Sequence, residues 1–324
     1  MSDQKRNVLL LSAGRRAELM QAFRAEMDKR GLQARLLATD LRPELAAACW
    51  QADASFAVPR VTDPGYLDHL LELCVQQNVG LVIPTIDTEL LGLAQSRARF
   101  AESGIQVVVS SDALVEQCRD KRRTAGLFES LDIDVPRTFN KEAIEFPCFA
   151  KPYDGSRSIG AAHLRSEAAL TTSMLSDPKL MFMEYVDSTH TEYTVDAYYD
   201  RKGNLRCMVP RLRMEVRDGE ISKGVTRRDH VYEYLCNRLR HIEGARGCLT
   251  IQLFARAQPR RFAALEINPR FGGGFPLSYA AGANYPGWLI DEYLLDQDVQ
   301  FFDAWEKDLL MLRYDAKVLV RDFQ

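Results

Sequence analysis

Short apolar runs alternate with amphipathic stretches through the first third of the chain. The apolar runs predict strands at Val8–Leu11, Ala34–Thr39, Ser55–Val58, Leu81–Pro84 and Gln106–Val109. The stretches between them predict helices that end at about Arg30, lie near Glu44–Ala52, and cover Gly65–Gln77 and Thr88–Ser103. Because strands alternate with helices, we expect an α/β domain with a parallel, doubly wound sheet.

The pattern changes from Ser110 onward. Helices are predicted at Asp112–Gln117 and Lys121–Leu131, with Asp112 or Asp120 as a cap and Pro136 as the stop. Period-two alternation then predicts strands at Cys148–Lys151, Leu180–Val186, Glu192–Tyr199, Leu205–Val209, Leu249–Ala255 and Arg261–Asn268. Runs of strands with few helices favour an α+β region of mainly antiparallel sheet.

Composition and charge narrow the function classes. Of the 324 residues, 46% are hydrophobic and 27% are charged, which excludes a disordered chain. The 42 Lys and Arg residues nearly balance the 45 Asp and Glu residues, for a net charge of −3. This balance supplies no positive field for nucleic acid or an anionic membrane, so neither is an expected partner.

The seven cysteines show neither metal-ligand spacing nor the pattern of a disulfide framework. They are expected to be buried thiols in a reducing compartment. Only four apolar residues, Val8–Leu11, follow the polar start, too few for a signal segment or a membrane span. The expected location is the cytoplasm.

Polar residues follow several strands of the predicted first domain. The turn Ser12–Arg16 joins a strand to a helix, a geometry that aims backbone N–H groups at an anion. Only Gly14 of the three glycines of a dinucleotide fingerprint is present, so an NAD site is not favoured. Asp40 and Asp87–Glu89 fall at the edge where open α/β sheets bind ligands, and helix capping explains them equally well.

Glu266 and Asn268 are the strongest local signal. They alternate along a predicted strand and therefore share one face, opposite Leu265 and Ile267. A carboxylate and an amide oxygen on one strand suit Mg²⁺. The alternative is the polar outer face of an edge strand.

A hairpin would add a third oxygen ligand to this face. If the last two predicted strands turn near Gln258-Pro259, the numbers of facing residues add to about 517 or 518, which places Gln252 beside Glu266. A slip of one residue would turn Gln252 to the other face.

Two further segments are suited to a nucleotide. Lys151 ends an apolar strand, and the loop after it offers an ammonium and exposed N–H groups to a polyphosphate, although a strand-end lysine before a solvent hairpin is the alternative. The apolar run Leu180–Val186 could offer backbone edges to adenine, with Glu192 placed for ribose hydroxyls, or it could be an ordinary core strand.

Arg211 and Arg213 alternate on the strand expected after Pro210 and so share a face. The planar fork of arginine suits a carboxylate or an acylphosphate. The alternative is that one of the two arginines is a solvent-exposed surface residue without a ligand.

The order and spacing of these residues resemble the ATP-grasp superfamily, above all stand-alone ligases related to the large chain of carbamoyl-phosphate synthase. The series runs through Lys121, Lys151, Met183-Glu184-Tyr185-Val186, Glu192, Gln252 and Glu266-x-Asn268-Pro-Arg270. The resemblance implies a Rossmann-like pre-ATP-grasp domain over residues 1–115, an N-terminal grasp subdomain over 116–190, and a C-terminal subdomain with the Mg²⁺ site over 191–324.

The resemblance also implies a role for each position. ATP phosphates would contact Lys121, Lys151 and a closing loop with Gly155, Ser156, Ser158 and Gly160. Adenine would lie at a hinge made by Met183, Glu184 and Val186, and the ribose on Glu192. Mg²⁺, with Mn²⁺ as an alternative, would be bound by Gln252, Glu266 and Asn268. The transferred phosphate and the acid would contact Arg270, Arg213 and Arg211. The five residues between Val186 and Glu192 depart from the spacing of the family.

The activity implied is an ATP-dependent ligation of a small carboxylic acid to an amine or ammonia through an acylphosphate, with release of ADP and phosphate. One alternative is a kinase for carbamate or another small acid, and another is a catalytically silent ATP-binding regulatory protein. Three retained metal ligands favour an enzyme. Apolar residues on the helices of the first domain are compatible with a homodimer.

Overall fold

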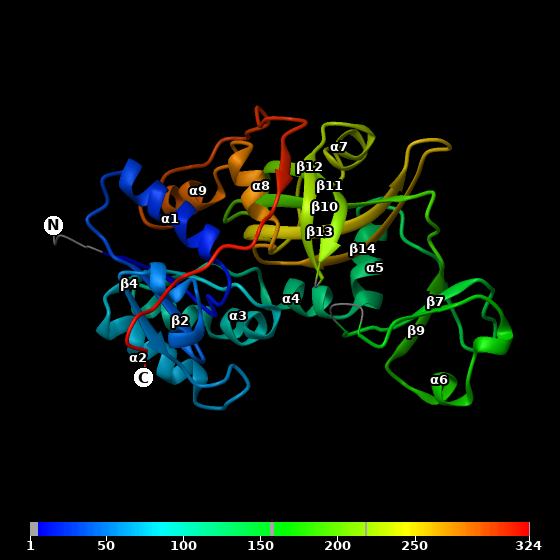
Figure 1. Ribbon diagram of the computed structural model, residues 1–324, viewed down its shortest axis with the longest axis horizontal. Helices are drawn as coiled ribbons and strands as arrows, with labels where there is room; N and C mark the ends of the chain where they lie inside the picture. Colours follow the sequence, from blue (N-terminus) through cyan, green and yellow to red (C-terminus); the bar gives the residue numbers. More distant parts are fainter. Residues whose placement is uncertain (1–5, 156–158, 218, 324) are drawn as a thin grey trace.

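The computed structural model describes residues 6–155, 159–217 and 219–323, and these residues form three β-sheets (Figure 1). Each sheet is built from one continuous segment of the chain. Ser156 and Ser158, predicted to lie in a phosphate loop, fall outside the described residues.

The first sheet is parallel, in the order β3-β2-β1-β4-β5. Its strands are β1 (Asn7–Leu10), β2 (Leu36–Asp40), β3 (Ala54–Ala57), β4 (Val79–Ile83) and β5 (Gln106–Val107). Helix α1 (Ala17–Lys29) covers one face, whereas α2 (Tyr66–Gln76) and α3 (Asp87–Glu102) cover the other. Because both faces are covered, the central strands β1 and β4 are buried throughout. The predicted doubly wound α/β domain is confirmed.

The helix predicted near Glu44–Ala52 is wrong. The segment forms two short 3₁₀ turns, η1 (Pro43–Leu45) and η2 (Cys49–Gln51). Between them, the Ala48 N–H donates to the carbonyl of Gly14 (3.0 Å) instead of bonding within a helix. The segment is thus held against the turn that follows β1.

The second sheet is small and antiparallel, in the order β6-β9-β7-β8. Its elements are β6 (Thr138–Phe139), β7 (Cys148–Pro152), β8 (Ala162–Leu164), η3 (Glu167–Ala169), α6 (Thr172–Ser176) and β9 (Leu180–Glu184). It forms a lobe that stands apart from the other two sheets (Figure 1). The N–H of Glu184 donates to the carbonyl of Arg137 (2.8 Å), so the two ends of the lobe meet.

The third sheet is antiparallel, in the order β14-β13-β10-β11-β12-β15. Its strands are β10 (Thr191–Tyr199), β11 (Leu205–Arg217), β12 (Glu220–Thr226), β13 (Gly247–Arg256), β14 (Arg261–Asn268) and β15 (Leu310–Leu312). Strand β11 joins the strand predicted to end at Val209 to the one expected after Pro210 and continues to Arg217. Strands β12 and β15 were not predicted. With the second sheet, it confirms the predicted antiparallel α+β region.

Three helices cover the apolar face of the third sheet: α4 (Asp112–Arg119), α5 (Lys121–Ser130) and α7 (His230–Leu235). The side chain of Ser111, not Asp112, caps α4, whereas Asp120 caps α5 as predicted. Helix α5 ends before Asp132, which has a positive φ of 57°, and so well before Pro136. Within the described part of the chain, no helix has the length and apolarity needed to cross a bilayer.

The first and third sheets share one hydrophobic core. Helices α8 (Phe275–Ala280) and α9 (Tyr285–Tyr293) pack against α1, and one buried cluster joins residues of all three helices to both sheets. At this junction the buried carboxylate of Glu26 accepts hydrogen bonds from Lys29 (2.6 Å), Arg30 (2.6 Å), Tyr279 (2.8 Å) and Asn284 (2.7 Å).

Candidate active site

The predicted oxygen ligands lie together on the polar face of the third sheet. Gln252 on β13 faces Glu266 on β14, as the hairpin predicted. A bulge after Gln252 shifts the register by one residue, so both predicted pairings occur, one on each side of the bulge. The alternative for Glu266 and Asn268 was the polar outer face of an edge strand. Strand β14 does lie at the edge of its sheet.

Lys121 joins three parts of this site. Its Nζ lies 3.5 Å from Glu266 Oε2 and donates to the carbonyl of Gly155 (2.5 Å). Its backbone N–H donates to the carbonyl of Tyr153 (3.0 Å). The start of α5, the loop after β7 and strand β14 therefore meet at one lysine.

Lys151 lies beside the same groups, near the end of β7. Burial and the positive charge of Lys121 lower the pKa of Lys151 to about 8, against the opposing effect of Glu266. Two neighbouring ammonium groups with one carboxylate leave positive charge uncompensated, which suits a polyphosphate.

The donor set around Glu266 fits a magnesium ion that is shared with phosphates. Glu266 supplies one carboxylate, Gln252 and Asn268 supply amide oxygens, and Asn268 Nδ2 donates to Glu266 Oε1 (3.1 Å). No group of three or more His, Cys, Asp or Glu side chains suited to a metal occurs among the described residues. Mg²⁺ is commonly bound by one or two carboxylates together with substrate phosphates rather than by a complete protein cage.

The residues predicted for the adenosine part follow the last strand of the lobe. Met183 and Glu184 end β9, and Val186 follows them. The Glu184 carboxylate pairs with Arg261. Glu192 is the second residue of β10 and pairs with Arg213, and burial raises the pKa of Glu192 despite that arginine.

Arg211 and Arg213 share a face of β11, as expected, but have different surroundings. Arg211 is 1% exposed, and its guanidinium makes two hydrogen bonds to Asp196, at 2.8 and 3.0 Å. Asp196 also accepts a hydrogen bond from Ser278 on α8 (2.6 Å). The remaining guanidinium nitrogen, Nη1, is buried without a hydrogen-bond partner, so a contact between Arg211 and an acid stays a prediction. Arg213 lies nearer the site, against Glu192.

Arg270 connects β14 to the first sheet. Its guanidinium binds both oxygens of Asp87, at 2.6 and 3.2 Å, and Asp87 is the first residue of α3. The end of the predicted metal strand therefore meets the carboxyl edge of the parallel sheet. Arg313 lies in the same region and was not predicted, because no periodic pattern surrounds β15.

Glu89, for which a ligand-binding role and helix capping were both expected, lies in the first turn of α3 and caps its backbone there. Its carboxylate accepts from the N–H groups of Thr85 (2.7 Å) and Ile86 (3.1 Å) at the start of α3. Burial raises the pKa of Glu89 to about 7, although these donors and Ser12 act against it. Asp40 likewise accepts from the N–H of Gly14 (2.9 Å).

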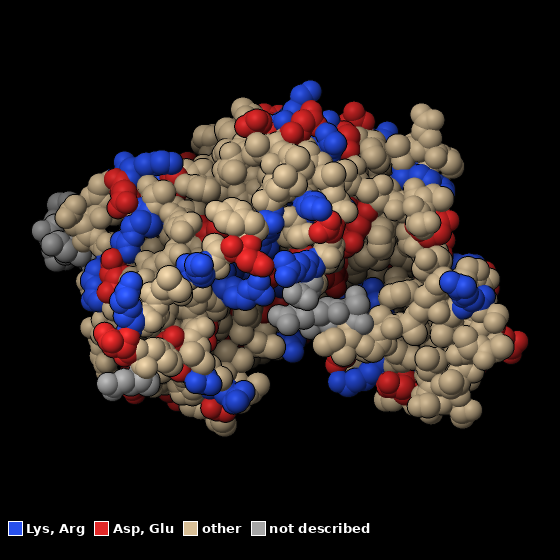
Figure 2. All heavy atoms as spheres, in the orientation of Figure 1, with Lys and Arg blue, Asp and Glu red and all other residues tan. Residues whose placement is uncertain are grey.

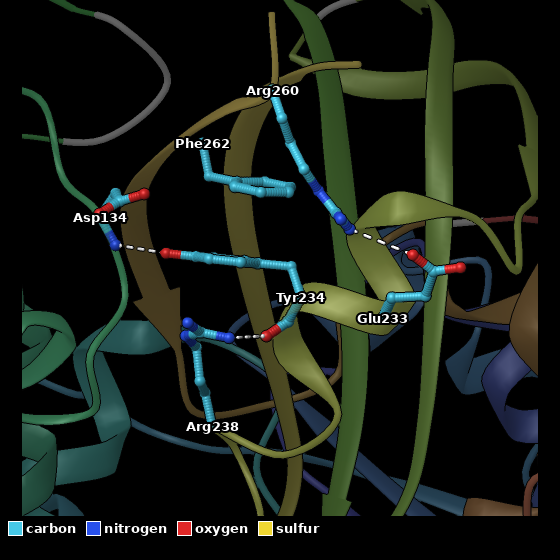
Figure 3. A pocket seen from close by; sticks show the side chains of 6 residues that line it. All are labelled: Asp134, Glu233, Tyr234, Arg238, Arg260 and Phe262. Atoms are coloured by element: carbon cyan, nitrogen blue, oxygen red, sulfur yellow. Dashed lines mark hydrogen bonds and ion pairs between the residues drawn. The ribbon is translucent and has the colours of Figure 1, made fainter. Parts of the chain in front are cut away.

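A cavity of about 380 Å³ lies away from these residues. It is lined by Asp134, Glu233, Tyr234, Arg238, Arg260 and Phe262 (Figure 3). The rings of Tyr234 and Phe262 stack at 3.7 Å, and Arg238 lies over Tyr234. The polar groups already have partners, since Tyr234 accepts from the Asp134 N–H and Arg260 pairs with Glu233. We therefore regard this cavity as structural.

Two family models match the chain. The model of the PylC-like N-terminal domain matches residues 8–108, and the model described as ATP-grasp in the biosynthetic pathway with Ter operon matches residues 176–315. No curated protein sequence matches the chain.

Solved structures share the fold at low sequence identity. The biotin carboxylase domain of the 2-oxoglutarate carboxylase of Hydrogenobacter thermophilus has a TM-score of 0.74 and 14% identity, over 94% of this chain and 73% of that chain. Biotin carboxylase of Campylobacter jejuni has a TM-score of 0.72 and 13% identity, over 95% and 75%. N5-carboxyaminoimidazole synthetase of Staphylococcus aureus has a TM-score of 0.69 and 14% identity, over 90% and 78%.

The two family models match different sheets of the structure. The first covers the parallel sheet, and the second covers the last strand of the lobe and the third sheet, with Glu266, Asn268 and Arg270. Residues 176–315 therefore match an ATP-grasp family, and nearly the whole chain shares the fold of these solved structures.

Proposed function

We propose that this protein is an ATP- and Mg²⁺-dependent ligase that joins a small carboxylic acid to an amine or ammonia through an acylphosphate. The ligands bound in similar solved structures support the choice of ATP and Mg²⁺. The Hydrogenobacter thermophilus domain was solved with MgADP, ADP and bicarbonate, and the Staphylococcus aureus synthetase with ADP.

One observation carries the proposal: two lysines from different elements converge on the carboxylate of Glu266. Lys121 is 3.5 Å from it, and the charge of Glu266 also acts on Lys151. A structural ion pair needs one lysine, whereas two lysines beside a carboxylate and two amides suit a metal-bound polyphosphate.

The proposed roles follow this arrangement. Lys121 and Lys151 hold the phosphates, with the loop that contains Gly155 and Gly160 beside them. Adenosine lies against Met183, Glu184, Val186 and Glu192. Gln252, Glu266 and Asn268 hold Mg²⁺, which offsets phosphate charge when it is bound.

The reaction requires positioning and charge compensation rather than a protein nucleophile. A carboxylate oxygen of the acid bonds to the γ-phosphorus of ATP, and the bond from that phosphorus to the β,γ-bridging oxygen breaks, releasing ADP. The amine then bonds to the acyl carbon, loses a proton, and phosphate leaves. Arg270 exchanges its pairing with Asp87 for the acid beside the phosphates, and the lysines offset charge on the phosphates.

The test is ADP release with a panel of acids and amines. We expect turnover to require both an acid and an amine in the wild-type protein and to be lost in Glu266→Ala and Asn268→Ala. Asp28→Asn, an exposed change on α1, is the matched control and should retain activity. Full activity of both site variants would refute the metal assignment.

A small-acid kinase is a second candidate, because bicarbonate is bound in a structural neighbour. Trapping with hydroxylamine detects an acylphosphate in either case. A ligase gives an amide when an amine is present, whereas a kinase releases the acylphosphate whether or not an amine is added.

A further inference from the structure

A cluster of arginines lies where the first sheet meets the third sheet. The turn Ser12–Arg16 follows β1, and residues 84–87 follow β4. These two strands are neighbours, and they form the switch point of the parallel sheet, where open α/β sheets bind ligands. In Figure 2, Lys and Arg side chains gather across the middle of the face shown, at this junction.

The backbone of the turn is held rigidly. Ser12 has a positive φ of 47°, which is uncommon for a residue with a side chain. Its hydroxyl donates to Glu89 (2.8 Å), and the hydroxyl of buried Thr85 donates to the carbonyls of Leu11 (3.0 Å) and Ser12 (2.9 Å). Strained residues that are fixed in this way concentrate at functional sites.

Arg16, at the end of this turn, is a half-buried cation without a close partner. Its side chain makes one long hydrogen bond, to the carbonyl of Thr85 (3.5 Å), and no ion pair with any described residue. Burial and the nearby charge of Arg270 lower the pKa of Arg16. The carboxylates of Glu220 and Asp87 also act on Arg16, but they pair with Arg313 and Arg270. Because arginine stays protonated in proteins, Arg16 keeps a positive charge that suits an anion from outside the chain.

The neighbouring arginines already have carboxylate partners. Arg270 binds Asp87, and Arg313 lies 3.1 Å from Glu220 and 3.8 Å from Glu18. Arg313 comes from the segment after β15, which runs back toward the first sheet (Figure 1). Its charge acts on Arg16, as does that of Glu220. Three separate parts of the chain thus contribute guanidinium groups to one region.

We propose that Arg16, with Arg313 beside it, binds a second anionic group of the acid, so that the substrate is a small acid with an additional carboxylate or phosphate. The planar fork of arginine suits both groups. Arg270 holds the reacting carboxylate beside the nucleotide, and Arg16 holds the other end. The identification of the ligand as the acid substrate rests on the proposed ligase function, whereas anion binding at Arg16 does not.

The test measures binding and turnover separately. Calorimetry on the full chain with Mg-ADP compares acetate, with one anionic group, with succinate and phosphonoacetate, which have two. We expect the dianions to bind at least 10-fold more tightly than acetate, and Arg16→Gln to weaken their binding by about 10- to 100-fold, the size of a lost charge-assisted hydrogen bond. Succinate and phosphonoacetate together show which second group is preferred.

Two control variants accompany Arg16→Gln and separate a loss of the anion site from a general loss of charge or of folding. Arg24→Gln removes an arginine of α1 that pairs with Asp53 at 2.8 Å, and it should leave anion binding unchanged. Arg16→Lys keeps the charge and should recover part of the affinity if the site is electrostatic. Mg-ADP affinity should be unchanged in all three variants, which also shows that they are folded.

Equal binding of acetate and the dianions, or unchanged dianion binding in Arg16→Gln, would overturn the proposal. In turnover assays, Arg16→Gln should raise the KM for the acid about 10- to 100-fold with little change in kcat. If no acid supports turnover but dianions bind through Arg16, the ligase function fails and the anion site stands.

Discussion

Lys151 and Lys121 place two ammonium groups beside one carboxylate, at the centre of the candidate site. Burial and Lys121 lower the pKa of Lys151 to about 8. The charged form of Lys151 is therefore disfavoured in the free protein and is favoured again when a polyphosphate binds. The affinity for nucleotide should consequently depend on pH in a range where an ordinary lysine does not titrate.

We expect Lys151→Met to weaken Mg-ADP binding by about 10- to 100-fold, because a charge-assisted hydrogen bond is lost. In the wild-type protein, affinity should fall as pH rises through about 8, since the charged lysine is lost there. Isothermal titration calorimetry between pH 7 and 9 measures both effects. Lys179→Met, which removes an exposed lysine of the same lobe, is the control. A wild-type affinity that is constant over this range would contradict the role of Lys151.

At the scale of elements, the glycine run after β14 brings α8 close to β11 and β12. A Cβ added to Gly274 would overlap the guanidinium of Arg211 and the side chain of Ile221. Arg211 is held by Asp196 and cannot swing aside without breaking a buried pair. The small size of Gly274 is therefore a packing requirement of this junction.

Gly274→Ala should lower the free energy of unfolding by about 1–3 kcal/mol, the usual range for overpacking. Gly126→Ala, at an exposed position of α5, adds a Cβ with no atom within 4 Å and should raise the free energy of unfolding by about 0.5–1 kcal/mol. Urea denaturation of both variants gives the comparison. Equal stability of Gly274→Ala and the wild type would show that Arg211 can move.

Elements with a clear local pattern could be predicted from the sequence, and those that depend on distant contacts could not. The alternation of strands β13 and β14 was sufficient to place Gln252 opposite Glu266. The segment near Glu44–Ala52 has helical composition, but a hydrogen bond from Ala48 to Gly14 holds it in another conformation. Strand β15 has only three residues and exists because it pairs with β12.

The same limit applies to the site. The positions of Glu266, Asn268 and Lys151 follow from local spacing, so they could be chosen in advance. The different surroundings of Arg211 and Arg213 depend on α8, which lies more than sixty residues later in the chain. Spacing alone could not distinguish Arg211, paired with buried Asp196, from Arg213, paired with Glu192.

At the scale of the whole molecule, α1, α8 and α9 join the first and third sheets into one cooperative core. Glu26 is the polar centre of that junction. Burial alone would raise the pKa of Glu26, but hydrogen bonds from Lys29, Asn284, Tyr279 and Arg30 outweigh it and lower the pKa to about 2. The ionised carboxylate therefore stabilises the contact between the two sheets.

Glu26→Gln should lower the free energy of unfolding by about 1–3 kcal/mol at pH 7, because hydrogen bonds to a charged group are weakened. Since the folded pKa is depressed, this contribution is complete above pH 4.5 and is lost as the pH falls toward 2. The difference between wild type and variant in urea denaturation should thus be smaller at pH 3 than at pH 7. Asp28→Asn, exposed on the same helix, should show no such difference. A difference that is independent of pH would contradict this account.

The meeting of the two ends of the lobe at Arg137 and Glu184 has an evolutionary consequence. The chain enters the lobe and leaves it at a single place. Residues 138–183 can therefore be replaced as one segment without interrupting the first or the third sheet. Lys151 and the loop after it lie inside this segment, whereas Arg16, Arg270 and Arg313 lie outside it. The proposed nucleotide contacts of the lobe can therefore change without a change in the proposed acid site, and a chimaera with a foreign lobe should keep its preference for the acid.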